Sequence, residues 1–223
     1  MKKNYKKTLI CGLIILIIFV LWTAAVMCID VSPSGPRKTP VGFSSVNSFI
    51  HRFTGVNLQL YFITDWLSLI PALIVVFFGL IGLSQWIRRK NILKVDRDIL
   101  LLGVYYIVVL SVYIGFEIFV VNYRPILING ILEASYPSST TVRTICVMQT
   151  TAVQINFRLK NDVLKKYINM AITLFGLFMV TARFISGVHW FTDIVGGILF
   201  STGLVMIYTS VCIWIYRTKN KNR

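Results

Sequence analysis

The sequence has few acidic residues and few cysteines, and both shortages narrow the class of protein. It contains 8 Asp and Glu residues against 23 Lys and Arg residues, which gives a net charge of +15. Its four cysteines, Cys11, Cys28, Cys146 and Cys212, all lie in or beside apolar runs and lack the spacing of a metal site. This placement argues against structural disulfides and a zinc site. The sequence shows no internal repeat or low-complexity tract, and we expect a single domain over residues 1–223.

What the sequence has in excess is apolar character. Hydrophobic residues make up 56% of the 223 positions, which is more than a soluble domain of this size needs. The basic residues lie almost entirely in short segments between apolar runs. That placement is typical of a membrane protein and not of a protein that binds nucleic acid. We therefore expect membrane lipids as partners and no nucleic acid.

Six apolar segments are each long enough to cross about 30 Å of hydrocarbon. The first follows a basic start and is too long for the core of a cleaved signal peptide, so we expect it to be retained. The segments are Leu9–Ile29, Trp66–Ile87, Ile99–Val121, Ser138–Phe157, Tyr167–Gly187 and His189–Tyr216. The sequence thus predicts an all-α integral membrane bundle of six transmembrane helices.

The distribution of basic residues predicts how this bundle is oriented. Seventeen of the 23 Lys and Arg residues fall at the termini or in connections that the six spans place on one side. Four fall on the other side, namely Arg37, Lys38, Arg52 and Arg124. Because Lys and Arg accumulate in cytoplasmic loops, we expect both termini in the cytoplasm. The 122–137 loop and the 187–190 junction are then predicted to lie on the outer face of the cell membrane.

The first outer segment, Asp30–Thr64, begins with a proline-rich extended loop. Apolar residues then recur with the spacing of an amphipathic helix, at Val46, Phe49, Ile50 and Phe53. This pattern predicts a short helix in the headgroup region that ends at Gly55. We interpret His51 on this helix as an interfacial polar residue, with a catalytic role as the alternative.

The stretch Ala182–Asp193 gathers charged side chains at the junction of two apolar segments. Arg183 and His189 are six residues apart, and His189 and Asp193 are four apart, a spacing that predicts one face of a helix. The carboxylate would accept the proton of one imidazole nitrogen and leave the other as a nucleophile or base. Charged groups at membrane depth are costly and are therefore candidates for function. The alternative is a capped helix start with a buried His–Asp pair.

A second polar cluster lies in the outer loop, where the chain reads N-Y-R-P and then E-A-S-Y-P-S-S-T-T. Pro125 is expected to end the third helix, and Pro137 to occupy the first turn of the fourth. The Ser138–Thr140 run would then present amides and hydroxyls at a helix N-terminus, where an anion binds well. Arg124 and Arg183 could bind the same oxyanion with paired N–H groups, which suits a phosphate. The alternatives are a snorkelling Arg124 and a simple N-cap.

The spacing R-P, then P-S-S-T, then R-x5-H-x3-D resembles the three-part signature of the type-2 phosphatidic acid phosphatase (lipid phosphate phosphatase) superfamily. The resemblance covers about residues 117–193, with a family-like core at about 99–216. It implies that His189 attacks phosphorus to form a phosphohistidine, that Asp193 orients it, and that no metal or other cofactor is needed. The residues that it implies for binding phosphate are Arg124, Ser138, Ser139, Thr140 and Arg183.

Two positions depart from that signature. Glu117 stands where the family has a lysine, and Thr140 stands where it has the histidine that acts as general acid. Losing general acid catalysis is expected to slow an enzyme about 10²–10⁴-fold without abolishing activity. A diphosphate would be favoured, because a phosphate leaves without a proton more readily than an alcohol does. We expect Arg143, one turn deeper on the face of Ser139 and Thr140, to pair with Glu117 or partly replace the lysine. The alternative places Arg143 against another buried acid or a water-filled cleft.

The sequence therefore favours a membrane lipid phosphatase that hydrolyses or transfers phosphate from a lipid phosphate or polyprenyl diphosphate at the outer membrane face. The alternative is a catalytically impaired relative that binds lipid phosphate or a partner protein. A channel or transporter has less support, since the polar residues gather at one face and line no path. The proton donor to the leaving group stays open between His51 and a water, and so does the oligomeric state.

Overall fold

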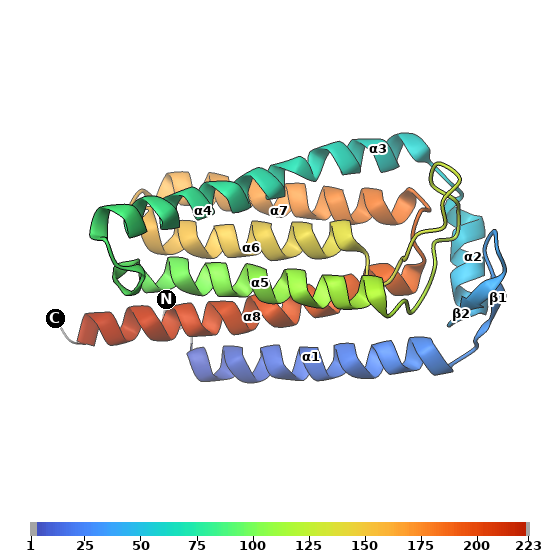
Figure 1. Cartoon of the computed structure of the whole chain (residues 1–223), viewed down its shortest axis with the longest axis horizontal. Helices are drawn as coiled ribbons and strands as arrows, with labels where there is room; N and C mark the ends of the chain where they lie inside the picture. Colours follow the sequence, from blue (N-terminus) through green and yellow to red (C-terminus); the bar gives the residue numbers. More distant parts are fainter. Residues whose placement is uncertain (1–3, 222–223) are drawn as a thin grey trace.

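The structure is a computed structural model that describes residues 4–221, and its long helices lie side by side along the long axis of the molecule (Figure 1). These helices are α1 (Tyr5–Cys28), α4 (Leu69–Arg89), α5 (Arg97–Ile118), α6 (Ser139–Arg158), α7 (Asp162–Ile185) and α8 (Phe191–Lys221). Short elements cross one end of the bundle, namely β1 (Ser32–Ser34), β2 (Thr39–Val41) and α2 (Ser44–Thr54). Helix α3 (Leu58–Leu67) leads into α4, and the 3-10 turn η1 (Ile92–Lys94) joins α4 to α5.

Most of these helices have the length and the apolar composition of membrane-spanning helices. Five stretches of the described chain are long and apolar enough to cross a membrane: Tyr5–Cys28, Leu58–Arg89, Arg97–Ile118, Asp162–Ile185 and Phe191–Thr218. In the most apolar window of each stretch, at most 33% of the residues are buried inside the protein. Apolar side chains that point outward over a whole helix need a hydrocarbon environment. The prediction of an all-α membrane bundle is confirmed.

Helix α6 takes the place of the predicted span Ser138–Phe157 but is more polar than the other long helices. Its residues Thr141, Thr144, Thr150 and Gln154 are all buried. Figure 1 shows α6 running beside α5 and α7. The polar side chains of α6 are therefore covered by protein, which is why its sequence lacks the uniform apolar character of a lipid-facing span.

Asparagine caps extend three of the predicted spans toward their N-termini. Asn4 accepts a hydrogen bond from the amide of Lys6, Asn57 from Leu60, and Asn161 from Leu164. An asparagine at this position satisfies one of the free amides of a helix start. As a result α1, α3 and α7 begin earlier than the predicted starts at 9, 66 and 167. The largest difference is at residues 58–64, a helical segment that the sequence pattern assigned to the polar outer stretch.

The polar stretch before α3 also contains the predicted amphipathic helix. Helix α2 covers Val46–Phe53, and its last turn ends at Gly55, whose amide donates to the carbonyl of His51 at 2.9 Å. Phe49 and Phe53 are 66% and 86% exposed, so the apolar face of α2 points away from the protein. The proline-rich segment before it forms the β1–β2 hairpin, which the sequence pattern predicted only as an extended loop.

Helices α1 and α8 pack closely over much of their length. A Cβ added at Gly12 would lie 3.0 Å from the Gly203 carbonyl oxygen, so small residues allow the two backbones to approach. Near the opposite end of α1, the Trp22 indole donates to the Thr192 carbonyl at 3.3 Å, and the Thr23 and Tyr136 hydroxyls are 2.7 Å apart. The first helix therefore braces the segments that carry the candidate site.

Candidate active site

His189 lies in the short turn between α7 and α8, before the first residue of α8. The prediction that His189 and Asp193 share one helix face is therefore wrong, because only Asp193 is helical. The physical reason is that the Asp193 carboxylate caps its own helix. It accepts a hydrogen bond from the backbone amide of Trp190 at 2.9 Å, so the helix begins at Phe191.

The backbone of this turn requires glycine at one position. Gly187 has φ of +67°, and a Cβ built there would lie 1.9 Å from the carbonyl oxygen of Gly55. Both the conformation and the close approach exclude a side chain. His51 adds a second restraint, since its Nε2 lies 3.0 Å from the Gly187 carbonyl oxygen and donates to it. His51 thus contacts the turn that carries His189.

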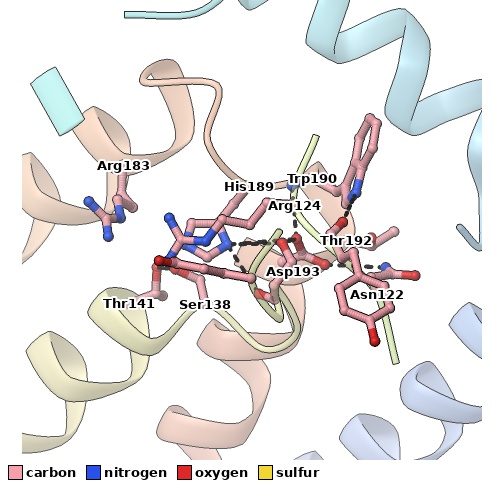
Figure 2. A network of polar contacts seen from close by, with 12 residues as sticks. Asn122, Arg124, Ser138, Thr141, Arg183, His189, Trp190, Thr192 and Asp193 are labelled. Atoms are coloured by element: carbon pink, nitrogen blue, oxygen red, sulfur yellow. Dashed lines mark hydrogen bonds and ion pairs between the residues drawn. The ribbon is translucent and has the colours of Figure 1, made fainter. Parts of the chain in front are cut away.

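The imidazole of His189 is 4% exposed and is oriented through Nδ1 (Figure 2). Nδ1 lies 3.1 Å from the Ser135 carbonyl oxygen and 3.2 Å from the Ser135 hydroxyl, while the Asp193 carboxylate is 3.7 Å away. A carbonyl oxygen can only accept, so Nδ1 carries the hydrogen and Nε2 keeps its lone pair. Nε2 has no hydrogen-bond partner among the described residues. The sequence predicted that the Asp193 carboxylate accepts the imidazole proton directly. In the structure the Ser135 carbonyl accepts it instead.

Burial also determines the charge of His189. Desolvation, together with the positive charges of Arg124 and Arg183, lowers the pKa of His189 to about 4, although Asp193 acts in the opposite direction. The imidazole is therefore neutral near pH 7. A neutral imidazole with a free Nε2 is the form that can act as a nucleophile.

Asp193 connects this turn to the loop between α5 and α6. Its carboxylate is fully buried and accepts hydrogen bonds from three donors (Figure 2). These are the Trp190 amide, the Ser135 hydroxyl and the Asn122 side-chain amide, the last at 3.3 Å. A buried carboxylate is tolerated when its oxygens are satisfied in this way. Asp193 therefore fixes the position of Ser135, which in turn contacts His189.

The loop that supplies Ser135 and Asn122 is an antiparallel hairpin. Its arms are joined by backbone hydrogen bonds from the Arg124 amide to the Glu133 carbonyl at 3.1 Å and from the Ser135 amide to the Asn122 carbonyl at 2.9 Å. Asn129 and Gly130 at its tip both have positive φ, as a tight turn requires. This pairing places Arg124 opposite Glu133 and brings both arms to the candidate site.

Arg124 is 7% exposed and already has an acidic partner. Its Nη2 lies 3.0 Å from a carboxylate oxygen of Glu133. Its Nε and Nη1 are buried without a hydrogen-bond partner in the part of the chain that the structure describes. Arg124 therefore keeps two N–H directions that an anion could use, while Glu133 partly neutralises its charge.

Arg183 is 2% exposed and is held by α3. Its Nη1 donates to the Tyr61 carbonyl at 3.3 Å and to the Thr64 hydroxyl at 3.0 Å, and Nη2 is 4.0 Å from Asp65. In Figure 2 it stands apart from the hydrogen-bonded cluster around Asp193. Its Cζ lies 4.7 Å from the centre of the Tyr61 ring, and the Cζ of Arg124 lies 5.9 Å from the same centre. Both guanidiniums thus lie within cation–π distance of the Tyr61 ring.

The start of α6 differs from the prediction at Pro137. The helix begins at Ser139 with Ser138 as N-cap, so Pro137 precedes the first turn. The Ser138 amide donates to the Asp193 carbonyl at 3.1 Å, and the Ser138 hydroxyl accepts from Thr141. The hydroxyl of Thr140 is buried and has no partner within residues 4–221.

A cavity of about 480 Å³ opens beside these residues. Its lining includes His189, Arg124 and Ser139, one residue from each of the three sequence motifs. Glu117 and Glu133 line it as well. The remaining predicted residues, Ser138, Thr140, Arg183 and Asp193, are buried and do not line this cavity.

Arg143 and Glu117 do not form the predicted ion pair, since no contact within 4.0 Å joins them in the described chain. Glu117 lines the polar cavity, whereas Arg143 lines a neighbouring cavity between α4, α5 and α6. Within the described residues, no cluster of three or more His, Cys, Asp or Glu side chains could hold a metal ion.

The helices and the polar cavity at one end of them define a multi-pass α-helical membrane protein. Its fold is similar to a crystal structure of a transmembrane PAP2-type phosphatidylglycerolphosphate phosphatase from Bacillus subtilis. The superposition has a TM-score of 0.64 and covers 91% of this chain and 94% of that chain, at 18% sequence identity. No family model and no curated protein matches the chain. The likeness therefore concerns the fold, and it extends over nearly the whole length of both chains.

Proposed function

We propose that this protein is a membrane lipid phosphatase whose nucleophile is His189. One observation carries the proposal. The imidazole is buried and neutral, its Nδ1 is held by Ser135, and its Nε2 is unpartnered in the described chain, while the residue lines a cavity together with Arg124. A buried nitrogen lone pair beside a guanidinium suits attack on a phosphate.

The proposed reaction has two steps. Nε2 of His189 attacks phosphorus, an N–P bond forms, and the P–O bond to the lipid breaks with its electron pair on the leaving oxygen. Water then attacks phosphorus, the N–P bond breaks with its electron pair returning to Nε2, and inorganic phosphate is released. Nδ1 keeps its hydrogen and donates it to the Ser135 carbonyl, and the Asp193 carboxylate at 3.7 Å stabilises the positive charge that develops on the ring.

The two arginines contribute in different ways under this proposal. Arg124 uses its Nε and Nη1 to donate to phosphate oxygens and keeps its contact with Glu133 through Nη2. Arg183 is engaged by α3 and contributes positive charge from beside Tyr61. The predicted contacts of Ser138, Ser139 and Thr140 with phosphate remain part of the proposal, with Ser139 the one that lines the cavity.

The substrate we favour is a lipid diphosphate. Thr140 cannot donate a proton near neutral pH, and the Nε2 of His51 already donates to Gly187. A departing phosphate needs a proton less than a departing alcohol does, so the missing general acid costs a diphosphate substrate least. A polyprenyl diphosphate is one member of this class.

We also propose that the termini are cytoplasmic and that the cavity faces the outer side of the cell membrane. Both ends of the described chain lie at the end of the bundle opposite α2 and the hairpin β1–β2 (Figure 1). The basic turn after α4 lies at that same end, and such turns are retained in the cytoplasm. Labelling of single cysteines introduced at Lys38 and Lys90 in intact cells tests this, with a membrane-impermeant reagent expected to reach only Lys38→Cys.

A trapped phosphoenzyme tests the function. Purified protein incubated with terminally labelled lipid diphosphate is expected to form an acid-labile, base-stable phosphoprotein. The chain has two histidines, which provides a matched pair of variants. His51→Ala is expected to retain the label and His189→Ala to lose it. Label on both variants would reject His189 as the nucleophile.

The second candidate is a catalytically impaired protein that binds lipid phosphate or a partner protein. The observation that favours it is the acidic lining of the cavity, where Glu117 replaces a cation and Glu133 pairs with Arg124. Binding of lipid phosphate without turnover and without a phosphoenzyme would decide for this candidate.

A further inference from the structure

A second cavity of about 420 Å³ lies between α4, α5 and α6, next to the polar one. Its wall is mostly aliphatic and includes Val75, Leu110 and Val147. Tyr113 and Ser139 line both cavities, so the polar cavity and this apolar groove meet at these two residues.

Arg143 is the charged residue on the wall of the groove. Its Nε is buried and has no hydrogen-bond partner in the described part of the chain, and its expected partner Glu117 is beyond ion-pair distance. A guanidinium in such surroundings is costly unless an anion binds it. Arg143 also lies one helical turn from Ser139, on the same face of α6.

We propose that Arg143 binds the inner phosphate of a lipid diphosphate whose terminal phosphate lies at His189 and whose apolar chain lies in this groove. This rests on the function proposed above and identifies its substrate class from a residue outside the three motifs. The order of groups along the protein is His189 with Arg124, then Ser139, then Arg143, then aliphatic side chains. A chain-linked diphosphate has the same order of a terminal phosphate, an inner phosphate and a hydrocarbon.

The position of Arg143 also accounts for the missing general acid. When Nε2 of His189 bonds to the terminal phosphorus, the bridging P–O bond breaks and its electron pair goes to the inner phosphate. That phosphate gains negative charge, which a neighbouring guanidinium stabilises without a proton transfer. The products are a lipid monophosphate and, after water has attacked the phosphohistidine, inorganic phosphate. No reactant other than water is required.

The groove offers room for a long chain. A third cavity of about 520 Å³ shares Val75, Tyr106 and Ile107 with the groove and continues along α5 as far as Ile99. From Tyr113 to Ile99 the helix advances by roughly 21 Å at 1.5 Å per residue. The apolar path therefore follows α5 over most of a bilayer's hydrocarbon thickness.

The test compares two substrates with the same chain, farnesyl diphosphate and farnesyl monophosphate, on purified full-length protein. Arg143→Gln is expected to lower kcat/KM for the diphosphate about 10–100-fold, as loss of a charge-assisted hydrogen bond would, and for the monophosphate less than about threefold. Arg143→Lys is expected to recover part of the difference. Arg52→Gln removes one charge from the exposed side of α2 and should leave both rates unchanged. The ratio of the two rates within one variant does not depend on how much of that protein is folded.

Equal losses on both substrates, or no loss on either, would overturn the role of Arg143. A binding arm separates this result from failure of the proposed function. In the His189→Ala background, farnesyl diphosphate is expected to bind about tenfold or more tightly than the monophosphate, and Arg143→Gln should remove that preference. Absence of turnover and of phosphoenzyme in the wild type rejects the phosphatase, but the binding preference would still uphold Arg143. Absence of the preference rejects the Arg143 proposal.

Discussion

Replacing Ser135 by alanine is expected to slow phosphoenzyme formation while leaving substrate binding nearly intact. The hydroxyl of Ser135 lies between two groups of the site. It donates to the Asp193 carboxylate and is 3.2 Å from Nδ1 of His189. The substitution removes both contacts but keeps the backbone carbonyl that lies 3.1 Å from Nδ1. The variant therefore measures how much the Ser135 hydroxyl contributes to orienting the imidazole, because the contribution of the Ser135 carbonyl is unchanged.

The magnitude follows from the hydrogen bond that is lost. A hydrogen bond to a charged group contributes about 1.5–3 kcal/mol. If this whole amount appeared in the barrier, kcat would fall about 10–150-fold, since each 1.36 kcal/mol is a factor of ten. The remaining carbonyl keeps the tautomer of His189, so we expect a loss near the lower end, about 10–30-fold. KM should change little, because Arg124 and its two free N–H directions are untouched.

The assay is rapid-quench measurement of the labelled phosphoenzyme over a range of lipid diphosphate concentrations. Ser201→Ala is the matched control, because its hydroxyl is also buried and donates to the Gly197 carbonyl within α8. Ser201→Ala should form the phosphoenzyme at the wild-type rate. A rate for Ser135→Ala within about twofold of wild type would refute the argument, since less than about 0.5 kcal/mol would then depend on the hydroxyl. The orientation of His189 would then have to come from the carbonyl and Asp193 alone.

Three further predictions concern pH, stability and chain length. The burial-lowered pKa of His189, about 4, predicts a kcat/KM that is flat above pH 5 and falls as the imidazole takes up a proton near pH 4. Stability should begin to fall at a higher pH than activity does, from about 6.5 down through 4, because the unfolded state binds that proton first. A step in kcat/KM near pH 6.5 would contradict the lowered pKa of His189. Gly187→Ala should destabilise the protein by at least about 2 kcal/mol, because its Cβ would meet the Gly55 carbonyl, whereas Gly176→Ala meets nothing; equal melting temperatures would count against the turn geometry. Gly103→Leu, at the deep end of the apolar path, should lower kcat/KM for a polyprenyl diphosphate about tenfold or more relative to a farnesyl one, whereas Gly176→Leu should not; an unchanged ratio would place the chain elsewhere.

The helices and the motif residues could be predicted because their signals are local. Long apolar runs determine which segments face lipid, and the bundle follows from them. The R-P, P-S-S-T and R-x5-H-x3-D motifs identify His189, Arg124 and Ser139, and these three line one cavity. These residues could be identified because each motif is a short contiguous stretch of sequence.

The contacts between segments could not be predicted, because they depend on structure that leaves no local signal. The i, i+4 spacing predicted a contact between Asp193 and His189. Because α8 begins at Phe191, His189 lies outside the helix and its imidazole contacts Ser135. Ser135 itself carries no motif and reaches the site only through the pairing of two hairpin arms. Arg183 contacts α3, whose early start at Leu58 depends on an asparagine cap that the apolar pattern does not reveal.

The three hydrogen bonds that the Asp193 carboxylate accepts have a consequence for insertion of the chain into the membrane. Its carboxylate is stable away from water only when Asn122 and Ser135 have already been delivered from the preceding loop. During synthesis α8 follows the α5–α6 loop, so its Asp193 carboxylate enters after the two side chains that must bind it. An insertion intermediate with a disordered hairpin would therefore carry an anion without two of its three hydrogen-bond donors.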